Sequence, residues 1–274
     1  MMPPSYRNIA VASTFSPRFA NVLAEAKRIR GRFGSSLCLI YVGDRNAETD
    51  QKFSQALQQL ELPADSRIHY TNGDPAAAIL QTVEDNEIDM IIAGALEKEV
   101  VLHSFVGNVA RRLVREAACS VMLFTEPNTE PKPLQRMVFV ADYSDHGQKA
   151  LKKAIELADR EQTERLYVIR IVTTFDEIRA ARETPADSTF TAMSTGDEET
   201  ALEEFVLSTG PTEVPIEVRC IRGNTGFAAS DFIQSVSANM LVVPIPPSPE
   251  LGPNLPPNIA WITDVIPCNL WVIR

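Results

Sequence analysis

Apolar residues along this chain follow two alternating patterns. Short uninterrupted apolar runs, such as residues 8–13 and 37–42, are typical of strands that are buried on both faces. Between these runs, apolar residues recur at helical spacing, as in residues 19–33, and Gly34 marks the end of that helix. Strands that alternate with helices in this way predict an α/β fold, with a parallel sheet covered by helices on both faces.

The same rules place the other elements. The Ser16–Pro17 pair predicts a helix N-cap followed by a first-turn proline, and Asp74–Pro75 predicts a second helix start of this kind. Further strands are expected at residues 67–70, 90–93, 121–124, 137–141, 166–172, 216–221, 240–243 and 270–273.

The chain carries this pattern twice. Residues 9–16 read against residues 137–144 with a shift of 128, and residues 89–92 read against residues 239–242 with a shift of 150. The second copy gains its extra residues mainly in a polar stretch between 173 and 200. A repeat of this length predicts two duplicated domains rather than a solenoid.

We place the two domains at residues 1–127 and 134–274, joined by a proline-containing linker around residues 126–133. The total of 274 residues, of which 45% are hydrophobic, is enough for two domains of ordinary size. No apolar stretch is long enough for a membrane helix, and residues 1–5 do not resemble a signal peptide. We therefore expect a cytoplasmic chain without membrane insertion.

The charge and the cysteine content limit the classes of function that the chain can have. The net charge is −10, and residues 128–274 carry 21 acidic against 13 basic residues, which argues against a nucleic-acid partner. The basic run at residues 27–32 is interpreted as a solvated helix face, because no aromatic residues are interleaved with it. The four cysteines are far apart, so we expect buried free thiols and no metal site.

One loop has the composition of a phosphate site. Gly94 follows the strand at residues 90–93, and Gly107 precedes a helix that begins near Asn108. Backbone N–H groups at a helix N-terminus, reached through glycines, form a cradle for phosphate. In this chain Glu97 places a carboxylate in the middle of that cradle.

Several short motifs accompany this loop in a fixed order, namely residues 14–16, 73–75, 89–94 and 117–121, and residues 142–144 repeat the first of them. Their order and spacing resemble the universal stress protein family in its tandem form. The resemblance covers nearly all of both halves. It implies two open five-stranded parallel-sheet domains with helices on both faces, of the adenine-nucleotide alpha hydrolase-like kind.

In family members that bind ATP, the nucleotide is held by the loop glycines, a following Gly-Ser/Thr pair, an early aspartate and the end of the second strand. Carried over by resemblance, the binding positions in this chain are Thr14, Val42, Gly94, Glu97, Gly107, Asn108 and Asp142. The first copy departs from the family at Thr14, Glu97 and Asn108. A carboxylate beside polyphosphate costs on the order of a few kcal/mol, and Lys98, Arg111 and Arg112 are the residues that would offset it.

The second copy departs further. It keeps the aspartate, Asp142, but has Pro244, Pro247 and the Pro256–Pro257 pair where the loop should supply glycines or donors. Proline has no N–H to donate and cannot adopt positive φ. We therefore expect no phosphate site in the second copy, and a hydrogen-bonding role for Asp142 at its turn.

These observations predict a tandem universal stress protein that acts as a stress-response binding or regulatory module, with nucleotide binding eroded and no catalytic or metal-ligand grouping. The apolar closing strands at 121–124 and 270–273 are expected to join the halves as an intramolecular pseudo-dimer. A homodimer and an unidentified protein partner stay open. One alternative is an ATP-binding protein that uses domain 1 only, with slow hydrolysis at most. Another is a regulatory partner of a membrane transporter.

Overall fold

The computed structural model describes residues 5–95, 107–172, 195–223, 225–246, 255, 259–263 and 267–274. In the first half the strands are β1 (Asn8–Ser13), β2 (Ser36–Val42), β3 (Ile68–Thr71), β4 (Met90–Gly94) and β5 (Ser120–Phe124), and the helices are α1 (Phe19–Phe33), α2 (Ala47–Gln59), α3 (Pro75–Asp85) and α4 (Asn108–Glu116). In the second half the strands are β6 (Arg136–Val140), β7 (Arg165–Val172), β8 (Ile216–Arg222), β9 (Met240–Pro244) and β10 (Asn269–Ile273), and the helices are α5 (Asp145–Glu161), α7 (Thr195–Leu207), α8 (Thr225–Ser235) and the short η1 (Ala260–Thr263).

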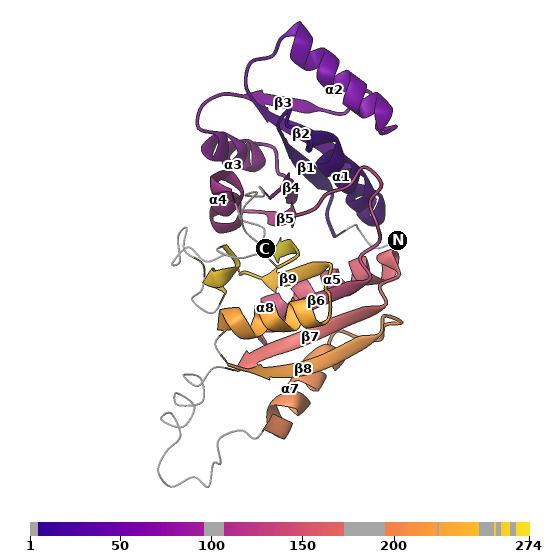
Figure 1. Cartoon of the computed structure of the whole chain (residues 1–274), viewed down its shortest axis with the longest axis vertical. Helices are drawn as coiled ribbons and strands as arrows, with labels where there is room; N and C mark the ends of the chain where they lie inside the picture. Colours follow the sequence, from indigo (N-terminus) through magenta and orange to yellow (C-terminus); the bar gives the residue numbers. More distant parts are fainter. Residues whose placement is uncertain are drawn as a thin grey trace.

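Within the described residues, ten strands form one continuous sheet in the order β3-β2-β1-β4-β5-β10-β9-β6-β7-β8 (Figure 1). Each half keeps its own five strands in parallel, in the same relative order, and this confirms the α/β fold expected from the apolar pattern. The two five-stranded units are joined edge to edge. The halves share one sheet without interleaving, because β5 and β10 pair with each other in the antiparallel sense.

The β5–β10 pairing has the register of a two-fold axis. Met122 lies opposite Trp271, with Val121 opposite Val272 and Leu123 opposite Leu270. Because Val121 and Leu270 are each the second residue of the closing strand in their own half, the approximate axis passes through the Met122–Trp271 pair. All five residues of β5 are buried, so the pairing also covers an apolar edge that would otherwise be open to other chains.

Two apolar cores run along the whole sheet, one on each face. Residues of α1, α2, α5 and α7 build the first core, and residues of α3, α4, α8 and η1 build the second. At the junction of the halves, Tyr6 and Phe33 of the first half pack on Trp271 of the second, with ring centroids 6.1 and 6.0 Å from the indole. No described helix is long and apolar enough to span a bilayer.

Local signals set the C-terminal end of α1 and the N-terminal end of α3. Gly34 ends α1 in the left-handed region (φ 69°), and Asp74 caps α3 by accepting a hydrogen bond from the Ala77 N–H at 3.0 Å. The expected start of α1 at Ser16–Pro17 is wrong. The Ser16 carbonyl accepts a hydrogen bond from the Phe19 N–H (3.0 Å), so Pro17 occupies the second position of a turn, and the helix begins only at Phe19.

The basic run at residues 27–32 is not simply a solvated face, which corrects the interpretation above. Arg28 of α1 is only 10% exposed, and it pairs with Glu161 of α5, whose side chain is fully buried. Arg32 also donates to Glu161 (2.7 Å), and the N–H of Leu134, the first residue after the linker, donates to the same carboxylate (2.8 Å). Arg28 further binds Glu25, whose pKa burial raises above its usual range. The run therefore ties the two halves together.

The cysteines carry free thiols, as expected, but their burial varies. Cys119 is buried, whereas Cys38, Cys220 and Cys268 are half-buried. Burial raises the pKa of Cys119 to about 12 and that of Cys38 to about 11, so these thiols are protonated at neutral pH.

The Glu161 network leads to a first prediction. Glu161→Gln removes the anion that Arg28 and Arg32 share and leaves Arg28 with Glu25 alone. Removal of one partner from a buried ion pair costs about 3 kcal/mol or more. We expect the free energy of unfolding in urea to fall by roughly that amount. The matched change Glu48→Gln removes an exposed pair with Lys52 on α2, and it should leave the unfolding midpoint almost unchanged. Equal effects of the two substitutions would contradict a stabilising role of the network.

Candidate functional site

The carboxyl ends of β1, β2 and β4 surround a cavity of about 540 Å³ in the first half. From β1 the chain continues to the neighbouring β2, whereas β4, on the other side of β1, is reached from β3. Such a switch point, beyond the carboxyl ends of the strands, is where open α/β sheets bind ligands. The volume lies within the range of small-molecule sites.

Four of the seven residues expected at a nucleotide site line this cavity: Thr14, Val42, Gly94 and Gly107. Asn108 is adjacent but exposed, and it does not line the cavity. Glu97, together with Lys98, lies outside the described residues. The seventh residue, Asp142, belongs to the second half.

The amino end of α4 faces the cavity. Gly107 is the N-cap, with φ −61° and ψ 159°, and no side chain caps the helix there. Asn108 is the first helical residue, and its side chain does not cap the helix. Val109 and Ala110 continue the lining. The first turn therefore presents backbone N–H groups and the positive end of the helix dipole to this side of the cavity.

Arg18 is a lining residue that the sequence did not single out. Its Nη1 donates to the Ala95 carbonyl at 3.0 Å, and its Nη2 donates to the Thr125 carbonyl. The guanidinium therefore places a fixed positive charge next to the start of the loop. Arg112, one of the residues expected to offset Glu97, is engaged elsewhere, because it pairs with Asp74 and with Glu116. The Arg112 hydrogen bond lowers the pKa of Glu116 below its usual range.

One wall of the cavity is aromatic. Phe15, Phe19 and Tyr41 line it, and Phe53 and Tyr70 stand behind them. The Phe15 centroid lies 4.7 Å from that of Phe53 and 5.0 Å from that of Tyr41. These rings come from a loop, two helices and two strands, so their meeting could not be read from the sequence.

The equivalent point in the second half is arranged differently. The Asp142 Oδ1 accepts hydrogen bonds from the Ser144 N–H (3.0 Å) and the Ser144 hydroxyl (2.8 Å). The absence of a side chain at Gly147 makes room for this, because a Cβ there would come within 2.0 Å of the same oxygen. Pro244 ends β9 as Gly94 ends β4. Pro247 and the Pro256–Pro257 pair lie outside the described residues.

A family model for the universal stress protein family matches residues 5–125 and 133–251. The chain belongs to this family. The tandem membership expected from the sequence is thereby confirmed. Among curated protein sequences, none matches the chain significantly.

Solved structures support the fold of this universal stress protein. A functionally unknown protein from Pseudomonas aeruginosa aligns with a TM-score of 0.72 and 14% identity, covering 98% of this chain and 92% of that chain. A universal stress protein from Archaeoglobus fulgidus aligns with a TM-score of 0.68 and 12% identity, covering 98% of this chain and 99% of that chain. At these identities the similarity shows the fold alone.

The Asp142 arrangement can be tested directly. Gly147→Ala would push a methyl group onto the Asp142 carboxylate, and we expect the free energy of unfolding to fall by about 1–2 kcal/mol. Gly31→Ala is the matched control, because nothing lies within 4 Å of a Cβ at that helical position. It should instead raise stability by roughly 0.5–1 kcal/mol. If Asp142→Ala does not relieve the cost of Gly147→Ala in the double variant, the contact is not its cause.

Proposed function

We propose that this tandem universal stress protein is a stress-response binding and regulatory module, not an enzyme, and that only its first half binds an adenine nucleotide. We expect the affinity for the nucleotide to be weak, because the Glu97 carboxylate in the loop would repel the phosphates. The observation that carries the proposal is the difference between the two switch points. The first is an open cavity bordered by Gly94 and Gly107, whereas in the second Asp142 bonds to its own turn and Pro244 replaces a glycine.

The chemistry of the cavity wall fits a nucleotide in two parts. Backbone N–H groups at the start of α4 and the charge of Arg18 favour phosphate on one side. The apolar Val42 and the rings of Phe15 and Tyr41 favour a flat base on the other side. Thr14 offers a hydroxyl where ATP-binding relatives have an aspartate.

A binding role is also supported by what the cavity wall lacks. Among the described residues that line it, none is a histidine or a carboxylate. A water molecule placed there would have no described side chain to act as its general base. Glu97 and His103 lie outside the described residues. The proposal is therefore tested by measuring nucleotide binding.

The decisive experiment is calorimetric titration of the full chain with ATP. If Glu97 is the main obstacle, Glu97→Gly should tighten binding at least about tenfold, which corresponds to roughly 1.4 kcal/mol. The stoichiometry should be one ATP per chain, because the second half lacks the cradle. Two ATP per chain would contradict the proline argument. If neither the wild-type protein nor the Glu97→Gly variant binds ATP, the cavity is not a nucleotide pocket. That result would favour a module that works through protein contacts alone.

Gly107→Pro tests whether the backbone N–H groups of the loop bind the phosphates. Its φ of −61° is already the value that proline requires, so the substitution removes one N–H donor with little strain. In the Glu97→Gly background it should abolish the gain in affinity. Retained affinity in this double variant would show that the N–H of residue 107 does not contact the ligand.

Arg18 gives an independent prediction. In the Glu97→Gly background, Arg18→Gln should weaken ATP binding about tenfold, because it removes the charge beside the loop. Arg45→Gln removes an exposed arginine that pairs with Asp50, away from the cavity lining, and it should leave the ATP affinity unchanged. A similar loss in both variants would point to long-range charge effects only.

A further inference from the structure

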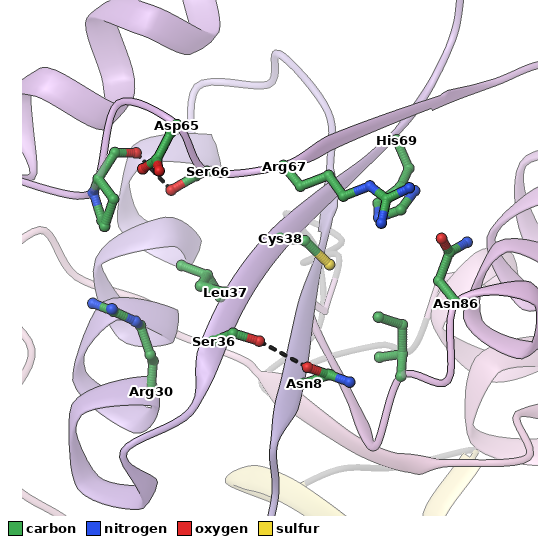
Figure 2. Close-up of a pocket in the computed structure, with 12 residues that line it drawn as sticks. Asn8, Arg30, Ser36, Leu37, Cys38, Asp65, Ser66, Arg67, His69 and Asn86 are labelled. Atoms are coloured by element: carbon green, nitrogen blue, oxygen red, sulfur yellow. Dashed lines mark hydrogen bonds between the residues drawn. The ribbon is translucent and has the colours of Figure 1, made fainter.

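A second cavity lies at the amino ends of β1, β2 and β3, at the opposite end of the sheet from the candidate nucleotide site. Its volume is about 380 Å³. Figure 2 shows its walls, which come from the first residues of the strands, the loop before β3, and the ends of α1 and α3. Ligands of open α/β sheets bind beyond the carboxyl ends of the strands, so this cavity is separate from the site described above.

Some of the polar groups around the cavity serve the fold. The Ser36 hydroxyl donates to the Asn8 side-chain oxygen at 2.9 Å, as the dashed line in Figure 2 marks. The Asn86 side chain donates to the Thr82 carbonyl at 2.9 Å, within the last turn of α3. These groups are therefore held in place by the protein itself.

Arg67 and His69 are different. In the part of the chain that the structure describes, neither side chain has a hydrogen bond or an ion pair, although both line the cavity. Figure 2 shows their head groups beside each other, with the Cys38 thiol and the Asn86 amide turned toward the same space. A guanidinium and an imidazole thus meet in one partly enclosed space.

The charge of Arg67 is not compensated locally. The charged residues that line the cavity are Arg30, Arg67 and Asp65, so the wall has a formal charge of +1 (two basic minus one acidic) in a chain of net charge −10. Asp65 lies at the far end, next to Ser66 (Figure 2). Burial raises the pKa of Cys38 to about 11, so this thiol is neutral and does not offset Arg67. Burial, and then the charge of Arg67, lower the pKa of His69.

We propose that this cavity binds a small organic anion by its oxyanion group, with Arg67 as the ionic partner and His69 as a hydrogen-bond donor. The planar fork of a guanidinium matches a carboxylate or a phosphate with two parallel hydrogen bonds. Leu37, Pro63 and Ile88 supply an apolar surface for the rest of the molecule. The proposal concerns a second site and does not depend on nucleotide binding in the first.

His69 reports occupancy of this site. In the isotope-labelled full chain, NMR can follow the pKa of His69 with and without inorganic phosphate or benzoate at constant ionic strength. A bound anion should raise the pKa of His69 by about one pH unit, because it binds the protonated ring about tenfold more tightly. Phosphate bound at α4 would leave His69 unchanged, since that helix start lies at the other end of the sheet. The probe with the lower half-saturation concentration identifies the ligand class.

Two substitutions make the test specific. Arg67→Gln should abolish the shift, and it is an exposed position where the fold should tolerate the change. Arg45→Gln, which removes a cation outside this cavity, should leave the shift intact. The proposal is overturned if neither probe moves the pKa of His69, or if the shift survives in Arg67→Gln. It is also overturned if the pKa of His146, which lies on α5 in the second half, shifts by the same amount.

Discussion

The antiparallel pairing of β5 with β10 is the contact on which the rest of this structure depends. Both strands are apolar on both faces, so each half alone would end in an exposed hydrophobic edge. Pairing them satisfies the backbone groups of both edges and extends the two cores across the junction. It also fixes the halves about an approximate two-fold axis. That arrangement brings α1 against α5, where Glu161 is buried between arginines of the other half.

This junction is connected to the candidate site. Thr125, the residue after β5, donates its N–H to the Asn269 side chain of the second half (2.9 Å) and accepts a hydrogen bond from Arg18 at the cavity. Arg274 donates to the Val114 carbonyl (2.8 Å) in the last turn of α4, the helix whose first turn faces the cavity. A cation at that end also suits the helix dipole. The second half thus supports the site of the first.

The two copies have kept their strands and changed their strand ends. Residues inside the sheet are packed on both faces, so a polar or bulky replacement there costs stability in either copy. Residues beyond the strand ends do not carry that constraint. Under the repeat shift of 128, Phe19 of the aromatic wall corresponds to Gly147, which makes room for the Asp142 carboxylate. The same fold therefore presents an open cavity at one switch point and a self-bonded turn at the other.

The sequence by itself determined the elements, the duplication and the family. Strands buried on both faces read as uninterrupted apolar runs, so every expected strand lies within one residue of the observed ends. Gly34, Asp74 and Gly107 mark helix ends because their signals are local. It also pointed to four residues of the cavity, through the resemblance.

Only the tertiary structure decided the rest, because it depends on partners far away in the chain. The sequence predicts that the closing strands join the halves, but it does not predict their antiparallel pairing into a single sheet. Arg28 and Glu161, which form an ion pair, are 133 residues apart in the chain. Arg18 reaches the cavity only because the Thr125 and Ala95 carbonyls lie beside it. Only the structure shows that the side chains of Arg67 and His69 face a cavity without a hydrogen-bond or ion-pair partner among the described residues. A sequence pattern records which side chains are available, but the packing of distant segments decides which of them are paired, buried or left facing a cavity.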